Sequence, residues 1–131
     1  MRILIVEDSE VIRELLGGLL ADYGSVDAAE SAEEALDLFR AAREEDEPFE
    51  LIFMDIMLPG KSGLQAIEEI RAEEDCLLNS AQPCQVKIVV VSALDDDVSA
   101  RRAFFQGHAL SYLTKPFSAD DIRGEMAKLG F

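Results

Sequence analysis

Five short apolar runs, each ending in polar or charged residues, constrain the fold of this 131-residue chain most strongly. Between them lie segments whose apolar residues recur with the helical period. Alternating strands and helices favour an α/β fold, in which helices cover both faces of a parallel sheet. The length is that of one ordinary domain and no interdomain linker is visible, so we expect residues 1–131 to form a single domain.

The strength of each apolar run indicates where its strand lies in the sheet. We expect strands over residues 3–6, 25–29, 51–54, 86–91 and 109–113. The first, third and fourth runs are mostly apolar, as in central strands that are buried on both faces. The second and fifth are weaker, as in edge strands. This distribution favours a doubly wound (βα)5 sheet with the flavodoxin-like order 2-1-3-4-5.

Capping residues mark the starts of several predicted helices. Ser9, Ser31 and Ser118 each precede a segment with helical periodicity. Ser31 and Glu34 also have the spacing of a capping box. Two further helices are expected, around residues 64–70 and over 95–106.

Net charge and hydropathy exclude several classes of function. The net charge is −15, from 27 acidic and 12 basic residues. Phosphate backbones repel such a chain, so we expect no direct binding of nucleic acid. No apolar run approaches the roughly 20 residues that cross a bilayer, so we expect no membrane insertion. The N-terminal MRILIVEDSE reaches acidic residues too early for a signal peptide, which favours a cytoplasmic location.

Cys76 and Cys84 are the only cysteines, and His108 is the only histidine. Cytoplasmic thiols are usually reduced and a zinc site needs more such ligands, so we expect two free thiols. Both cysteines lie in residues 75–85, which lengthen the connection between the third and fourth strands. We expect this segment to be a passive surface loop, with a partner contact as the alternative.

Polar residues follow four of the predicted strands, at the sheet edge where α/β proteins bind ligands. They are Glu7 and Asp8 after the first strand, Asp55 after the third, Ser92 after the fourth and Lys115 after the fifth. Three carboxylates at one edge repel one another, and a divalent cation would relieve that repulsion. Hard oxygen ligands suit Mg²⁺, with Mn²⁺ as an alternative.

The same set of side chains could hold a phosphoryl group. A metal ion and Lys115 would neutralise its oxygens, and the Ser92 hydroxyl would donate a hydrogen bond to one of them. A carboxylate is already ionised at neutral pH and can form an acyl phosphate without a separate base. The residues therefore favour phosphoryl transfer onto a carboxylate.

Four motifs, in order along the chain, resemble those of response-regulator receiver domains, the CheY-like superfamily of two-component signal transduction. They are Glu7-Asp8, MDIMLPGKSG at 54–63, VVVSA at 89–93 and YLTKPF at 112–117. The resemblance extends over the whole chain. It implies a phosphoacceptor signalling domain that promotes only its own phosphorylation and dephosphorylation, and not an enzyme.

The resemblance assigns the residues around the phosphoacceptor. It implies that Asp55 accepts the phosphoryl group. Glu7 and Asp8 would hold Mg²⁺ together with Asp55, Asp8 more directly and Glu7 partly through water. Met57 matches a position that binds the metal through its backbone carbonyl, so its side-chain type is free.

The resemblance also assigns the residues that respond to phosphorylation. Ser92 matches the hydroxyl residue that moves toward the phosphoryl group, and Lys115 matches the active-site lysine. Tyr112 matches an aromatic switch residue; the alternative is an ordinary tyrosine of an edge strand. Pro116 matches a proline whose peptide bond with Lys115 is often cis.

The partners implied are a sensor histidine kinase or a histidine phosphotransferase as donor, and a downstream protein target. Phosphorylation would change the face formed by the helix over 95–106, the strand over 109–113 and the helix after Ser118. Through the same face, the chain is expected to be a monomer or a weak dimer.

Three alternatives are weighed against this interpretation. The chain ends soon after its last predicted helix, which favours a stand-alone receiver of the chemotaxis or phosphorelay type. The alternative is a receiver from a longer regulator with a DNA-binding or enzymatic output domain. Metal-dependent phosphatases or nucleases typically need an Asp-x-Asp pair, which Asp55-Ile56-Met57 lacks. A receiver that is never phosphorylated is disfavoured because all five site residues are present.

Overall fold

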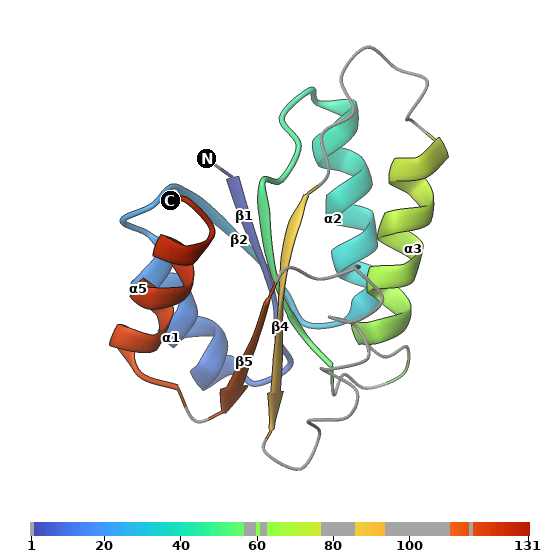
Figure 1. The fold of residues 1–131 in the computed structure, drawn as a ribbon. Helices are drawn as coiled ribbons and strands as arrows, with labels where there is room; N and C mark the ends of the chain where they lie inside the picture. Colours follow the sequence, from blue (N-terminus) through green and yellow to red (C-terminus); the bar gives the residue numbers. More distant parts are fainter. Residues whose placement is uncertain (1, 57–59, 61–62, 77–85, 94–110, 116) are drawn as a thin grey trace.

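A computed structural model describes residues 2–56, 60, 63–76, 86–93, 111–115 and 117–131 (Figure 1). The elements in chain order are β1 (Arg2–Val6), α1 (Glu10–Leu20), β2 (Ser25–Ala29), α2 (Ala32–Glu44), β3 (Leu51–Asp55), α3 (Gly63–Cys76), β4 (Lys87–Ala93), β5 (Ser111–Lys115) and α5 (Ala119–Lys128). The helix expected over 95–106 and most of the segment 75–85 lie outside the described residues.

The five strands form one parallel sheet in the order β2-β1-β3-β4-β5. This order confirms the one expected from the strong central and weak outer apolar runs. The observed β4 and β5 both extend two residues further than the sequence indicates, to Ala93 and Lys115. Their pairing with each other continues to those residues. All the strands therefore run with their carboxyl ends at the same edge.

Alternate residues of the strands pack into two separate cores, because successive side chains in a strand point to opposite faces. In Figure 1, α2 and α3 cover one face of the sheet and α1 and α5 cover the other. The core under α2 and α3 contains Leu4, Val6, Ile52, Met54, Ile88 and Val90. The core under α1 and α5 contains Ile3, Ile5, Leu51, Phe53, Val89 and Val91. Every residue of β3 is buried.

The helix caps agree only in part with the sequence patterns. Ser118 makes the full capping box with Asp121, with both reciprocal hydrogen bonds present. At α2 the Ser31 hydroxyl accepts from the Glu34 N–H at 3.2 Å. The Glu34 carboxylate, however, accepts from the N–H of Glu30. Ser9 occupies the N-cap position of α1, but its side chain makes no capping hydrogen bond. Ser9 is therefore the N-cap residue that the sequence predicts, although its side chain does not bind the helix backbone.

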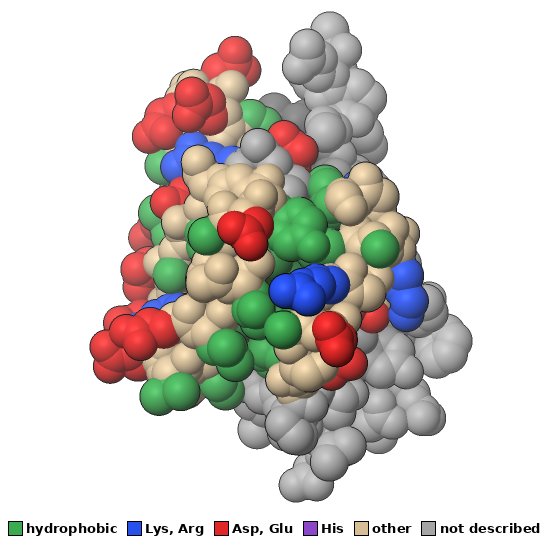
Figure 2. All heavy atoms as spheres, turned by 90° about the vertical axis from the view of Figure 1, so that its left-hand side faces the viewer, with side chains coloured by type: hydrophobic (Ala, Val, Ile, Leu, Met, Phe, Trp, Pro, Cys, Tyr) green, Lys and Arg blue, Asp and Glu red, His purple; other side chains and the backbone are tan. Residues whose placement is uncertain are grey.

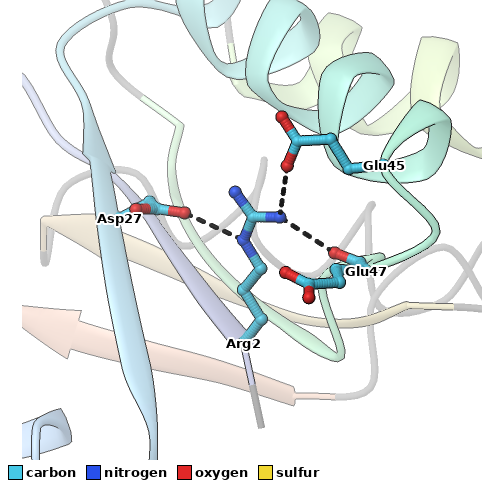
Figure 3. A network of polar contacts seen from close by, with 4 residues as sticks. All are labelled: Arg2, Asp27, Glu45 and Glu47. Atoms are coloured by element: carbon cyan, nitrogen blue, oxygen red, sulfur yellow. Dashed lines mark hydrogen bonds and ion pairs between the residues drawn. The ribbon is translucent and has the colours of Figure 1, made fainter.

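Arg2 fixes the amino end of β1 (Figure 3). Its Nε donates to Asp27 Oδ2 at 3.0 Å, which joins β1 to the neighbouring strand. Its Nη1 donates to the backbone carbonyl of Glu47 at 3.1 Å and lies 3.4 Å from Glu45 Oε2. The guanidinium also stacks over the Phe49 ring, 4.8 Å from the ring centre. One side chain thus ties the strand to the connection between α2 and β3.

The end of α5 is held against the start of β4. Lys87 Nζ donates to the backbone carbonyl of Leu129 at 2.8 Å and lies 4.5 Å from the centre of the Phe131 ring. Gly130 has a φ of +91°, a conformation in which glycine carries little steric cost.

No helix in the described part of the chain is long and apolar enough to cross a membrane.

Candidate functional site

Three carboxylates converge at the carboxyl edge of the sheet. Side-chain oxygens of Glu7, Asp8 and Asp55 lie within 4.8 Å of one another. Glu7 and Asp55 are buried, with 1% and 3% of their surface exposed, whereas Asp8 is exposed. Two acidic groups are thus taken out of water beside a third that faces it. This is the group that the sequence predicts from residues 7, 8 and 55.

Strand pairing explains why Glu7 meets Asp55. β1 and β3 are paired in a register that sets Ile5 beside Phe53 and Val6 beside Met54. One residue further along this register, Glu7 is level with Asp55. On the side of β2, the Glu7 backbone is held by its N–H, which donates to the Ala29 carbonyl at 3.0 Å. The two buried carboxylates therefore lie side by side because of the sheet itself.

The turn from β1 into α1 sets the direction of the Glu7 side chain. The N–H of Ser9 donates to Glu7 Oε1 at 3.2 Å. Asp8 lies between these two residues and reaches the same place from the solvent side. The two acidic residues that follow β1 thus belong to one short turn, in which the Ser9 N–H binds the Glu7 carboxylate.

Gly63 brings the start of α3 against the backbone of Asp55. Its N–H donates to the carbonyl of Ile56 at 3.1 Å. A Cβ atom on Gly63 would lie 2.0 Å from the backbone oxygen of Asp55. Only glycine allows such a close approach of helix and strand. Gly63 therefore lets α3 begin directly beside the end of β3.

The remaining predicted residues are placed by their strands. Asp55 is paired with Val91, and the β4–β5 register sets Ser92 beside Thr114 and Ala93 beside Lys115. Ser92 and Lys115 are therefore in the backbone at the same sheet edge as the three acids.

Tyr112 lies further from that edge, paired with Val90. Met57 and Pro116, with the peptide bond expected to be cis, lie outside the described residues.

Sequence reasoning did not single out Arg13, which the structure places behind the acidic turn. Its Nη1 donates to the carbonyl of Glu7 at 3.0 Å and lies 3.5 Å from the carbonyl of Asp8. Its Nη2 lies 3.3 Å from Glu30 Oε1. One signal was available. A cation near a helix N-terminus opposes the helix dipole and therefore calls for nearby acceptors.

The donor set fits a hard divalent cation. Carboxylate oxygens that converge from three residues are the ligands that Mg²⁺ and Mn²⁺ prefer. Of the three carboxylates, that of Asp8 is the one exposed to solvent. The arrangement can therefore bring a cation to a buried carboxylate.

The chain belongs to the response regulator receiver domain family, whose model matches residues 3–127. Response regulator RR06 of Streptococcus pneumoniae is 33% identical over 119 residues, which are 90% of this chain and 48% of that protein. Transcriptional regulatory protein KdpE of Staphylococcus aureus is 34% identical over 126 residues, 95% of this chain and 48% of that protein. The chain thus spans about half the length of these relatives.

The solved structures agree with this assignment at the level of fold. Chemotaxis protein CheY4 of Vibrio cholerae superposes with a TM-score of 0.77 and 21% identity, covering 97% of this chain and 96% of that chain. The expected resemblance is therefore confirmed. Receiver domains of two-component systems are signalling domains and not classical enzymes; they generally bind Mg²⁺ and interact with histidine kinases and output targets.

Proposed function

We propose that this receiver accepts a phosphoryl group on the carboxylate of Asp55, at a Mg²⁺ site formed with Glu7 and Asp8. The observation that carries the proposal is the convergence of these three carboxylates within 4.8 Å, in a chain that belongs to the receiver family. Mn²⁺ would suit the same oxygen ligands. Met57 would add its backbone carbonyl, as the family resemblance implies.

Transfer would proceed by attack of an Asp55 carboxylate oxygen on the phosphorus of a phosphohistidine. A new O–P bond forms, the P–N bond breaks, and the imidazole takes up a proton as it leaves. When bound, the divalent cation would supply positive charge for the phosphoryl oxygens. Lys115 would add a second positive charge and Ser92 a hydroxyl donor, since their strands end at the same edge.

Burial of Asp55 supports its role as nucleophile. With 3% of its surface exposed, the carboxylate has lost most of its hydration. Electrostatic interactions are stronger where water is excluded, so a cation and a lysine act more strongly there than at the surface. The Gly63 N–H holds the backbone just after this residue, because it donates to the Ile56 carbonyl at 3.1 Å.

The signal would leave the site through β5 and α5, together with residues 95–106. Ser111 Oγ donates to Glu125 Oε2 at 2.5 Å, which ties β5 to α5. A phosphoryl group adds about two negative charges. Movement of Ser92 toward them, followed by Tyr112, would shift the population of this face and change its affinity for a target or a second copy of the chain.

The donor would be a sensor histidine kinase or a histidine phosphotransferase. It would dock on the surface of α1, beside the acidic site. Val11 and Leu15 of α1 are 76% and 48% exposed although apolar. Figure 2 shows the side of the molecule that carries α1 and α5, where hydrophobic and acidic side chains both reach the surface. An exposed apolar surface next to the site supports protein docking there.

Two downstream roles are proposed for this receiver. The receiver could bind its target directly, or it could control an output domain, as the name transcriptional regulatory protein suggests for KdpE. The relatives are about twice as long as this chain, which supports the second role. The net charge of −15 still argues against nucleic-acid binding by residues 1–131 themselves. A mass measurement of the native protein would separate the two.

The test is labelling with acetyl phosphate and Mg²⁺, followed by intact-protein mass spectrometry. We expect the native chain to gain one phosphoryl group and Asp55→Asn to gain none. Asp37→Asn, at an exposed position of α2, is the matched control and should be labelled like the native chain. Labelling of Asp55→Asn at the native rate would refute the assignment. A metal chelator should slow the labelling of the native chain.

A further inference from the structure

Arg13 is a mostly buried cation on the inner side of the acidic turn. Only 16% of its side chain is exposed. Its Nη1 contacts the carbonyl oxygens of Glu7 and Asp8, at 3.0 and 3.5 Å, and its Nη2 pairs with Glu30 at 3.3 Å. Glu30 directly follows β2, so the guanidinium joins the ends of β1 and β2 across the start of α1.

The carbonyls that Arg13 binds belong to the two residues whose carboxylates converge with Asp55. The backbone of Glu7 is held at both of its polar groups, since its N–H donates to the Ala29 carbonyl and its own carbonyl accepts from Arg13. Hydrogen bonds from a charged donor are shorter and about twice as strong as neutral ones. The direction of each carboxylate depends on the backbone from which it projects. A fixed backbone in this turn therefore fixes the directions of the Glu7 and Asp8 carboxylates.

We propose that Arg13 is a positioning residue for the divalent-cation site, acting through the carbonyls of Glu7 and Asp8. The proposal rests on the proposed function of the acid cluster. Metal ligands need to be held within about 0.5 Å of their binding geometry. Groups outside the ligand set that orient the ligands typically contribute 10–100-fold to metal affinity. Arg13 has contacts suited to this role, because it binds the backbone carbonyls of the two acidic residues in the turn.

The sign of the effect separates positioning from simple electrostatics. Arg13 is positive, so its charge opposes the binding of a cation nearby. Loss of that charge alone would strengthen metal binding. Loss of the hydrogen bonds to the turn would weaken it, because the acids would no longer be held together. A neutral residue at position 13 that weakens metal binding therefore acts through lost positioning.

Arg2 supplies a matched control. It lies at the amino end of β1, whereas Arg13 binds the turn that follows the carboxyl end of β1. It too is an arginine that ties β1 to β2 and to a loop backbone, through Asp27 and the carbonyl of Glu47 (Figure 3). It lies at the amino end of β1, away from the acids. Substitution of Arg2 should lower stability and leave the cation site unchanged.

The experiment is a titration with Mn²⁺ alone, with the free ion measured by electron paramagnetic resonance, on folded protein verified by thermal melting. We expect Arg13→Met to bind Mn²⁺ at least about tenfold more weakly than the native chain does. Arg2→Met should bind it like the native chain. Unchanged or tighter binding by Arg13→Met would overturn the proposal. So would an equal loss in Arg2→Met, which would indicate general destabilisation.

Two further variants complete the test. Asp8→Asn should also weaken Mn²⁺ binding; native affinity in this variant would mean that the proposed cation site is wrong, whatever Arg13 does. If Arg13→Met does not fold, Arg13→Lys replaces it. The lysine keeps the charge but has one nitrogen in place of the two, Nη1 and Nη2, that make the contacts. A several-fold loss of affinity in Arg13→Lys supports the proposal, and native affinity overturns it.

Discussion

Gly63 and Asp55 are in such close contact that a methyl group on the glycine would lie 2.0 Å from the aspartate carbonyl oxygen. The same glycine donates its N–H to Ile56, the residue that follows the candidate phosphoacceptor. The start of α3 and the end of β3 thus form one backbone junction. The consequences of altering it can be measured separately for folding and for phosphorylation.

Gly63→Ala should destabilise the chain and slow its phosphorylation. The methyl group would have to displace backbone atoms of Asp55, and overpacking of this kind typically costs about 1–3 kcal/mol. Urea unfolding would give the free energy, and acetyl phosphate labelling would give the rate. Gly124→Ala is the matched control, because a Cβ there meets nothing within 4 Å and α5 should gain helix propensity. Native stability in Gly63→Ala would contradict the packing argument.

Removal of the metal should lower the stability of the native chain but not that of Asp8→Asn. A ligand that binds only the folded state stabilises it by about 2.7 kcal/mol at 100 times its dissociation constant. Thermal melts with Mg²⁺ and with a chelator would measure the difference. Asp8 is exposed, so its replacement should leave the fold intact. A Mg²⁺-dependent shift that is equal in both chains would place the cation elsewhere.

Ser111→Ala should weaken the junction between β5 and α5. Its hydroxyl donates to Glu125 Oε2 at 2.5 Å, and only 8% of Glu125 is exposed. Loss of a hydrogen bond to a charged, largely buried group typically costs about 1.5–3 kcal/mol. Lys128→Met is the control: the lysine pairs with the same carboxylate but is 73% exposed, so its removal should have a small effect. Equal unfolding free energies for the two variants would refute this ranking.

The stabilisation by Arg2 should not change between about pH 7 and pH 10. Burial alone would lower the pKa of Arg2, but the hydrogen bonds and charges of Asp27 and Glu45 raise it above its ordinary value. A raised pKa means that the stabilisation is complete below the unfolded-state pKa and is lost only as the pH rises through the folded one. That window is strongly alkaline for arginine. Unfolding of native and Arg2→Met chains at both pH values checks it; a difference that shrinks by pH 10 would count against it.

The sheet order and the acidic site could be anticipated because both depend on short-range patterns. The nearly continuous apolar runs of β1, β3 and β4 are dictated by burial on two faces, and parallel pairing then brings the strand ends together. The ends of β4 and β5 were less predictable. Each continues two residues further because its partner strand continues beside it.

Arg13 and the capping contacts show what the patterns did not contain. Ser9 has the residue type of an N-cap, yet no hydrogen bond from its side chain caps α1. The role of Arg13 depends on a side chain folding back over six residues to the Glu7 carbonyl, which no helical or strand period encodes. Motif reading finds the ligands by type, whereas what holds their backbones becomes visible only in three dimensions.

The burial of β3 along its whole length has a consequence for where the molecule can deform. Two cores clamp this strand, with hydrogen-bonded neighbours on both edges. A phosphoryl group on Asp55 would therefore add its charge at the end of a strand whose backbone is tightly held. The edge of the sheet is less constrained, because the edge strand β5 has one neighbouring strand. We expect displacement to accumulate at that edge while the modified residue itself hardly moves, so the phosphorylated site and the surface that moves are different parts of the sheet.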